Sequence, residues 1–350
     1  MDSRVFFERF VLGLFLILML FVSVFFLGKH FLRSSNDFTR EIRPVMGSYM
    51  TITAYFSDQK YLKKSIDEAF DEIKQVENIM SPFIETSELS ILNKAAKPGR
   101  YKVSDHVWNV LLISDRLNKE TEGAFDVTIQ PLYNLWKMAE ARNKIPTDEE
   151  LRNTLKSIGW DKIVLHHRSK EIEFTVPDMQ LTFGGIASGY AIDIIVNSFR
   201  ESGIKNFLID EGGDIFCSGQ PGTRALWRIG VKDPLNKSRV FKVLEFKDMA
   251  VVTSGNYERY YKIGDSSYSQ IFSPKTGLPV KQTVATTVIA NDTITADGWS
   301  TSLMVLGVDR GIEILKNRKD MHALIISSDN GKLTIKSTPG FSNYEKKDVQ

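Results

Sequence analysis

The feature that most constrains this chain is an uncharged, largely apolar run near its amino end. Residues 10–28 read FVLGLFLILMLFVSVFFLG and are bounded by Arg9 and Lys29. About 20 such residues are enough for a helix to cross the hydrocarbon core of a bilayer. A secretory signal peptide has a shorter apolar core followed by a small-residue cleavage site, which FFLGKHF does not provide. We therefore expect an uncleaved transmembrane helix here rather than a buried core helix.

The charges that flank this segment do not decide its orientation. Arg4 and Arg9 precede it, while Lys29 and Arg33 follow it, so neither side carries the excess of positive charge typical of the cytoplasmic side. The rest of the chain has no Gly/Ser-rich or Pro-rich linker and no internal repeat, which favours one domain, with room for two lobes. The expected division is a short flank at 1–9, the anchor at 10–28, a juxtamembrane linker at 29–43, one folded domain at 44–340 and a polar tail at 341–350.

The composition excludes several other classes of protein. The chain has 45 Lys and Arg against 43 Asp and Glu, and 42% of its residues are hydrophobic, as in ordinary globular proteins. Because this balance is nearly neutral, we expect no nucleic-acid partner. Cys217 is the single cysteine, so an internal disulfide and a cysteine-based metal site are both excluded. The five histidines do not occur at metal-ligand spacing, and we expect no zinc site.

Hydrophobic periodicity predicts a mixture of helices and strands. Apolar residues recur at helical spacing over 61–80, 105–120, 147–159 and 189–200. The third of these begins with a Thr-x-x-Glu capping box, Thr147 to Glu150. Strands are predicted at 49–56, 171–183, 206–210, 226–232, 240–252, 267–272, 284–290 and 322–336. Because several strands follow one another through short turns, we expect an α+β fold with mixed, largely antiparallel sheets and packed helices.

Three polar segments marked by glycines are candidates for a binding site. In LTFGGIASGYAID (181–193), a strand ends in two glycines and a helix begins near Ser188, which favours phosphate binding but is equally typical of a plain turn. IDEGGDIFCSG (209–219) carries three acids that could hold a cation or a ribose, although a hairpin explains its glycines. In the third segment, 252–280, Arg259 and Lys275 are either phosphate contacts or solvated surface charges.

A fourth segment, TADGWSTSLMVLG (295–307), raises a choice between a helix cap and a cation site. Asp297 and Thr301 stand four residues apart, so in a helix both side chains lie on one face. Asp is a preferred residue at a helix N-cap. Oxygen ligands completed by water and substrate phosphate are what Mg²⁺ prefers. The residues alone favour neither interpretation.

Seven motifs in their order along the chain resemble those of the FAD:protein FMN transferase (ApbE) family. Members of this family cleave FAD and attach FMN to a Ser or Thr of a target protein. The resemblance begins at RPVMGSYMTITAYF, extends to about residue 327 and so covers nearly all of the chain beyond the apolar segment. The motifs are MSPFIETSELSILNKA, GAFDVTIQPLYNLW, GGIASGYAIDII, IDEGGDI, VTSGNYERYY, FSPKTGLPV and ADGWSTSLMVLG.

The resemblance implies a role for each of several residues. Met46 and Phe83 are expected to contact the flavin or adenine part of FAD, and the backbone of Ile271 is expected to line the pocket at the pyrophosphate. Thr182 and Ser188 are expected near the pyrophosphate. Ala124, Phe125 and Asp126 are similar to the family's dinucleotide-binding segment. The expected magnesium ligands are Asp297, Thr301 and the backbone carbonyl of Gly185, and this favours the cation at the fourth segment.

The sequence departs from the family's pattern where a proton acceptor is expected. Gln270 stands where members commonly have His, and Ser273 stands where they have Asp. Ser188 replaces a common Lys or Glu, and Asn256 stands where Asp is frequent. A glutamine amide has no proton-accepting group near neutral pH, so these changes bear on the rate of transfer more than on binding. Asp297 and Gln270 are the expected catalytic residues.

The expected function is that of a Mg²⁺-dependent FAD:protein FMN transferase, which joins FMN through a phosphoester to Ser or Thr of an acceptor flavoprotein and releases AMP. The alternatives are an FAD-binding protein without transferase activity and an FAD pyrophosphatase that gives FMN and AMP. The apolar segment predicts a single pass through the lipid bilayer of the cytoplasmic (inner) membrane. The resemblance implies an extracytoplasmic, periplasmic catalytic domain.

Overall fold

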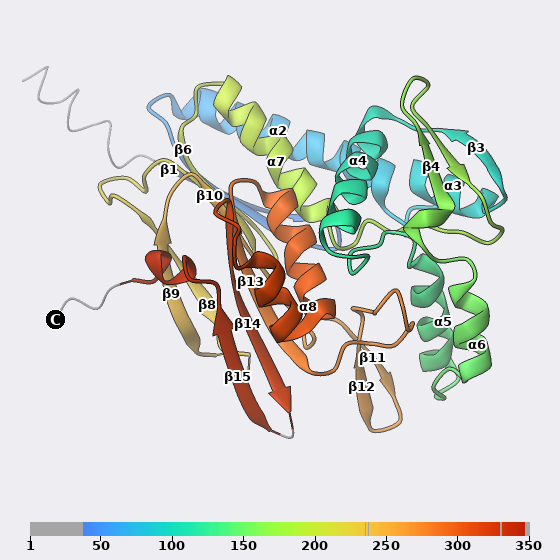
Figure 1. The fold of residues 1–350 in the computed structure, drawn as a ribbon. Helices are drawn as coiled ribbons and strands as arrows, with labels where there is room; N and C mark the ends of the chain where they lie inside the picture. Colours follow the sequence, from blue (N-terminus) through green and yellow to red (C-terminus); the bar gives the residue numbers. More distant parts are fainter. Residues whose placement is uncertain (1–37, 235, 237, 330, 347–350) are drawn as a thin grey trace, which may run out of the picture.

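The protein is described by a computed structural model that covers residues 38–234, 236, 238–329 and 331–346. Its centre is an eight-stranded sheet in the order β1-β2-β6-β7-β10-β13-β14-β15, and each neighbouring pair is antiparallel (Figure 1). These strands are β1 (Phe38–Val45), β2 (Ser48–Tyr55), β6 (Asn206–Glu211), β7 (Asp214–Ser218), β10 (Met249–Gly255), β13 (Thr283–Ala290), β14 (Met321–Asp329) and β15 (Lys332–Ser337). The predicted α+β fold with largely antiparallel pairing is confirmed.

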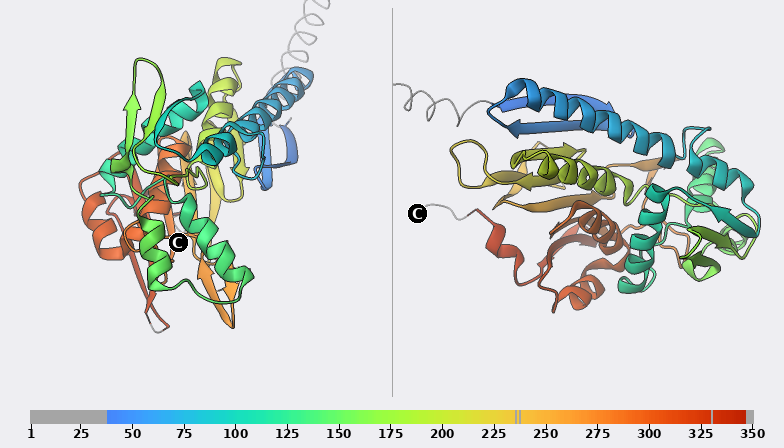
Figure 2. Two further views of the ribbon diagram at one scale, coloured as in Figure 1. Left: turned by 90° about the vertical axis from the view of Figure 1, so that its right-hand side faces the viewer. Right: turned by 90° about the horizontal axis from the view of Figure 1, so that it is seen from above.

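Three long helices, α2 (Gln59–Met80), α7 (Ala187–Glu201) and α8 (Thr293–Leu315), cover one face of this sheet (Figures 1 and 2). Each turns an apolar side to the strands, and Ile66, Ile195 and Trp299 are fully buried there. Burying one such side chain contributes about 1.5–3 kcal/mol. Helix α7 crosses α8 on this face, and this crossing positions the candidate site.

The opposite face of the sheet is covered by the hairpin of β8 (Trp227–Lys232) and β9 (Val240–Phe246). Apolar side chains of the hairpin, such as Trp227 and Leu244, form a second core with Cys217 and Ile289 of the sheet. The single cysteine is therefore fully buried.

The remaining elements form a lobe at one end of the sheet, on the right of Figure 1. They are α3 (Glu88–Ala95), β3 (Gly99–Lys102), α4 (Asp105–Glu120), α5 (Gln130–Ala141), α6 (Asp148–Leu155), the 3₁₀ turn η1 (Trp160–Lys162), β4 (Ile163–His166) and β5 (Glu171–Phe174). The hairpin of β11 (Tyr260–Ile263) and β12 (Ser266–Ser269) packs on α5 through a third core around Trp136 and Phe272. The capping box of Thr147 and Glu150 is present and begins α6, as predicted.

Three predicted strands have different bounds in the structure. The run 240–252 was predicted as one strand but forms β9 and β10, because the chain turns at Asp248, whose φ is 56°, and enters the large sheet. The predicted strand 171–183 ends at Phe174, beyond which only Gln180 makes an isolated bridge, to Ile129. The run 322–336 folds back on itself as the hairpin of β14 and β15.

The structure also bears on the two ends of the domain. Strand β1 begins at Phe38, so residues 38–43 of the expected juxtamembrane linker belong to the sheet. The 3₁₀ turn η2 (Phe341–Tyr344) buries Phe341, so the start of the expected polar tail packs on the domain. Among the described residues, no helix is long and apolar enough to cross a membrane, and the predicted transmembrane segment 10–28 lies outside them.

Candidate active site

The glycine turn of residues 183–186 connects the lobe to the start of α7. Just before it, the Thr182 N–H donates to the Val127 carbonyl at 2.7 Å, which places the turn beside the GAFD segment. Helix α7 begins at Ala187, and its N-cap residue, Ile186, offers no side-chain acceptor to the first N–H groups of the helix. Free N–H groups at a helix start favour an anion, but the Ala187 N–H already donates to the Phe183 carbonyl at 2.8 Å and the Gly189 N–H to Asp297 at 3.1 Å.

Asp297 is not the N-cap of α8. The cap is Asp292, whose carboxylate accepts a hydrogen bond from the Thr295 N–H at 2.9 Å. Asp297 lies one turn further along the helix, is only 6% exposed, and accepts through Oδ2 from the Gly189 N–H of α7 at 3.1 Å. The helix-cap interpretation of Asp297 is therefore wrong, and its carboxylate is directed to the start of α7.

The three residues predicted to bind magnesium lie together at this crossing. A Cβ placed on Gly185 would stand 3.0 Å from Oγ1 of Thr301, so the backbone of the glycine turn lies directly against that hydroxyl. Thr301 follows Asp297 by one helical turn on the same face of α8. A carboxylate, a hydroxyl and a backbone carbonyl are the oxygen ligands that Mg²⁺ prefers.

Two further acids concentrate negative charge near Asp297. Glu211 and Asp214 end and begin the paired strands β6 and β7, and they face each other across the turn. Burial raises the pKa of Glu211, and burial together with the charges of Asp297 and Glu211 raises the pKa of Asp214. Burial raises the pKa of Asp297 to about 7, and the charge of Glu211 adds to this effect. A bound cation would relieve this repulsion, so the residues fit one.

The described residues contain no group of three or more His, Cys, Asp and Glu side chains arranged to hold a metal ion. A magnesium site here would therefore depend on the Asp297 carboxylate, on neutral oxygens of Thr301 and Gly185, and on water and substrate phosphate. This donor set is typical of Mg²⁺ bound together with a phosphate substrate.

Arg259 and Asp193 are the charged residues that complete this region. The positive charge of Arg259 lowers the pKa of Glu211, Asp214 and Asp297. Asp193 of α7 accepts from the N–H groups of Thr293 and Ile294, both at 2.9 Å, and so caps α8 from the neighbouring helix. Burial raises the pKa of Asp193 to about 6. Its position in an amphipathic helix gave no signal of this role.

The GAFD segment is held by internal hydrogen bonds. Ala124, Phe125 and Asp126 are each at most 8% exposed. The Asp126 carboxylate accepts from the N–H and the hydroxyl of Thr128, at 2.8 and 2.6 Å, and from the Trp160 N–H at 3.1 Å. Asp126 therefore fixes the loop, and a direct contact of its side chain with FAD stays a prediction.

Met46 and Phe83 lie in two connections between elements, where Met46 is half-buried against the main core and Phe83 is exposed. Met46 and Gly47 form the two-residue turn between β1 and β2, with φ angles of 49° and 78°. This left-handed conformation is unfavourable for methionine, and such strain gathers at functional positions. Phe83 follows α2 and is 87% exposed, which leaves its ring free to contact a flat ligand.

Ser188, Gln270 and Ile271 connect the acids to the β11–β12 hairpin. The Ser188 hydroxyl donates to the Glu211 carboxylate, so Ser188 stands at the acids where a longer side chain is common in the family. The Gln270 N–H donates to the Arg259 carbonyl at 3.1 Å. The Ile271 carbonyl accepts from the Val280 N–H at 2.9 Å. Gln270 is therefore fixed, through its backbone, to the residue whose charge acts on the acids.

Solved structures with this fold are flavin transferases and related proteins. The chain matches the flavin transferase ApbE from Vibrio cholerae with a TM-score of 0.78 and 29% identity, over 88% of this chain and 99% of that one. It matches the ApbE protein from Thermotoga maritima with a TM-score of 0.80 and 25% identity, over 89% and 100% of the two chains. The fold is thus that of flavin transferases.

Sequence comparison gives the family. The chain belongs to the ApbE family, whose profile matches residues 46–325. It is 32% identical to the FAD:protein FMN transferase of Vibrio cholerae over 296 residues, which are 82% of this chain and 87% of that protein. It is 26% identical to the FAD:protein FMN transferase of Escherichia coli K12 over 289 residues, 81% of each chain. The resemblance that the motifs predicted is confirmed.

Proposed function

We propose that the chain is a Mg²⁺-dependent FAD:protein FMN transferase. The observation that carries the proposal is the convergence of Gly185, Asp297 and Thr301 at the α7–α8 crossing, in a chain similar to named transferases over most of its length. The reaction joins a Ser or Thr hydroxyl oxygen of the acceptor to the phosphorus on the FMN side of FAD. The pyrophosphate bond to AMP breaks, and the hydroxyl proton must pass to a base.

Different residues of the chain would bind different parts of the substrate and the metal. The start of α7 and Thr182 would face the pyrophosphate, and Asp297, Thr301 and the Gly185 carbonyl would hold Mg²⁺. When bound, Mg²⁺ stabilises negative charge on the phosphate oxygens. Met46 and Phe83 would orient the flavin or adenine part. These assignments rest on the placement of the side chains and on the family resemblance.

The reaction also needs a base that receives the proton of the Ser or Thr hydroxyl. Gln270 can orient a phosphate or a hydroxyl by hydrogen bonds, but its amide takes no proton near neutral pH. Asp210, Glu211 and Asp214 are the nearby acids, and burial raises the pKa of each of them, which makes a carboxylate a stronger base. One of these acids or a group of the acceptor protein would then receive the proton.

One experiment separates this function from the two alternatives. The purified protein is incubated with FAD, Mg²⁺ and a soluble flavoprotein domain that carries a Ser or Thr acceptor. We expect flavin fluorescence that stays with the acceptor after denaturation, together with one AMP per flavin attached. Free FMN and AMP without labelled acceptor would indicate a pyrophosphatase, and bound but intact FAD would indicate a binding protein.

We further propose that residues 10–28 anchor the domain in the cytoplasmic membrane, with the domain on its outer side. The apolar sequence supports this, as do the apolar side chains on the β1–β2 hairpin, which follows the predicted anchor in the sequence: Phe38, Ile42 and Tyr49 are 52%, 56% and 67% exposed. Removal of residues 1–33 should release the protein from membranes and leave FAD binding intact. A carboxyl-terminal reporter active only in the periplasm tests the orientation, and a cytoplasmic signal would contradict it.

A further inference from the structure

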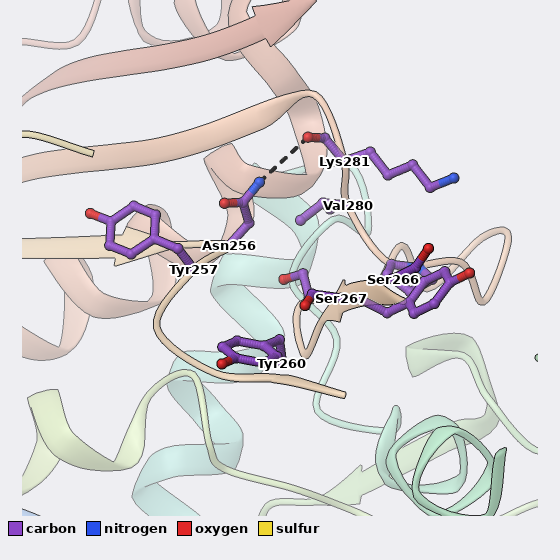
Figure 3. A pocket seen from close by; sticks show the side chains of 10 residues that line it. Asn256, Tyr257, Tyr260, Ser266, Ser267, Val280 and Lys281 are labelled. Atoms are coloured by element: carbon purple, nitrogen blue, oxygen red, sulfur yellow. Dashed lines mark hydrogen bonds between the residues drawn. The ribbon is translucent and has the colours of Figure 1, made fainter. Parts of the chain in front are cut away.

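A cavity of about 570 Å³ opens beside the β11–β12 hairpin, outside the residues expected to bind FAD (Figure 3). Its walls come from the loop after β10, from strand β12 and from the segment that follows the Gly277 turn. The lining residues that bear on its chemistry are Asn256, Tyr257, Tyr260, Ser267, Ser269 and Lys281. Its volume is in the range of ordinary ligand sites.

The cavity shares its wall with the residues of the reaction centre. Ser269 lines it and directly precedes Gln270, and Val280 lines it and donates its N–H to the Ile271 carbonyl at 2.9 Å. Tyr260 lines it and directly follows Arg259, whose charge acts on the buried acids. The cavity therefore lies beside Gln270 and Ile271, and one of its lining residues is the sequence neighbour of Arg259.

The wall formed by the hairpin is held in place by α5 and by the residues just beyond its end. The Lys262 N–H donates to the Glu140 carboxylate at 2.6 Å, and the Gly264 N–H donates to the side-chain carbonyl of Asn143 at the same distance. The Tyr261 hydroxyl donates to a backbone carbonyl of α5 at 3.3 Å. A site held open in this way does not have to be ordered when a ligand binds.

The chemistry of the lining suits a polypeptide better than a nucleotide. Within the described residues, Lys281 is the only charged side chain of the lining, and the others offer serine hydroxyls, an amide, tyrosine rings and two apolar residues. Hydroxyls and amides pair with an uncharged peptide backbone, and tyrosine combines apolar contact area with a polar tip. A pyrophosphate would find a single positive charge here, and that charge is on an exposed lysine.

We infer that this cavity binds the segment of the acceptor protein that carries the reactive Ser or Thr, so that the hydroxyl is presented next to Gln270. The inference rests on the proposed transferase function and adds to it a docking site for the second substrate. The acceptor hydroxyl would then approach the phosphorus from the side opposite the AMP leaving group. In-line displacement requires such opposed approach of the attacking and leaving oxygens.

The test is to fill the cavity without touching the FAD residues. Ser267 is exposed on β12, and Ser267→Trp places an indole in the opening. Ser337→Trp is the matched control, because Ser337 is an exposed serine on β15, which lies across the large sheet. For each full-length protein, the KM for the acceptor domain, the KM for FAD and the affinity for FAD are measured. The acceptor domain with its reactive residue changed to Ala serves as a binding probe.

We expect Ser267→Trp to raise the acceptor KM and the Kd of the unreactive probe at least tenfold, with FAD affinity and the control variant as in the wild type. Tyr260→Ala, at a side chain that is 50% exposed, should give a smaller rise in the acceptor KM. This variant tests the inference if Ser267→Trp does not fold. A wild-type acceptor KM in both variants overturns the inference and leaves the transferase function intact. A rise in the KM for FAD instead would assign the cavity to FAD and also overturn it. Failure of the wild type to label any acceptor would refute the proposed function itself, and the inference with it.

Discussion

Replacement of Gly189 by Ala tests whether the α7–α8 crossing fixes the candidate metal site. A Cβ on Gly189 would stand 2.7 Å from the Cα of Ile294, 2.7 Å from the Thr293 carbonyl oxygen and 2.9 Å from the Cβ of Asp297. The first two are backbone atoms, so no side-chain rotation relieves the contact, and the helices must separate by more than half an ångström to reach ordinary van der Waals distance.

The expected cost follows from these contacts. Overpacking of this kind costs about 1–3 kcal/mol, and rigid backbone on both sides favours the upper end. The better helix propensity of Ala returns about 1 kcal/mol, so we expect Gly189→Ala to lower the free energy of unfolding by about 1–2 kcal/mol. Because Gly189 also donates to Asp297, the carboxylate moves with the helix. A displacement of about 1 Å at a reacting group can reduce the rate about 100-fold.

Urea unfolding followed by tryptophan fluorescence measures the first effect, and Mg²⁺-dependent release of AMP from FAD measures the second. Gly184→Ala is the control for stability, since a Cβ there would meet only the Thr182 hydroxyl, at 3.6 Å. If Gly189→Ala unfolds at the same urea concentration as Gly184→Ala and releases AMP at the wild-type rate, the close crossing does not position Asp297 and the reasoning is refuted.

Three further predictions concern single side chains. Asp297→Ala should abolish Mg²⁺-dependent AMP release and Thr301→Ala should weaken it less, because only the first removes a charged ligand; a normal Mg²⁺ response of Asp297→Ala would contradict the metal assignment. Gln270→His should speed FMN transfer by up to about 10²- to 10⁴-fold and add a titration near pH 6 to 7 to the rate profile, with FAD affinity unchanged; no new titration would mean that Gln270 only orients its neighbours. Burial raises the pKa of Asp193 to about 6 from 3.8, so its contribution to stability is present at low pH and is lost as the pH rises through 6. Relative to the wild type, Asp193→Asn should therefore gain up to about 3 kcal/mol between about pH 4 and pH 7 in the free energy of unfolding, and a pH-independent difference would count against this.

Local patterns in the sequence predicted most of the elements that pair or pack within a short stretch of chain. The amphipathic run of α2 and the capping box of α6 depend on residues three or four apart, so the sequence displays them directly. The division of residues 240–252 into two strands depends instead on pairing partners in other strands. Strand β9 pairs with β8 and strand β10 with β7 and β13, and nothing in the run itself distinguishes the two sheets.

In the candidate site too, some residues could be predicted from the sequence and others could not. The ordered motifs predicted Asp297, Thr301 and Gly185, and the structure brings these three residues together. Asp193 was not predicted as a second cap of α8, because the residues it contacts lie 100 or more positions further along the chain. From the sequence, Asp297 could equally be a helix N-cap or a metal ligand. The structure excludes the N-cap of α8, because that helix begins at Thr293.

The two expected catalytic residues, Asp297 and Gln270, lie on separate parts of the fold. Asp297 and the start of α7, just after Gly185, are held by two helices that cross with no side chain between them at Gly189, so this packing contact bears directly on residues proposed to bind the metal. Gln270 lies on a different segment, at the end of the β11–β12 hairpin, where its N–H donates to the Arg259 carbonyl. We therefore expect a change at position 270 to leave the helix crossing unchanged. Proton transfer and ligand binding can vary independently in this fold, and substitutions at the crossing should affect both at once.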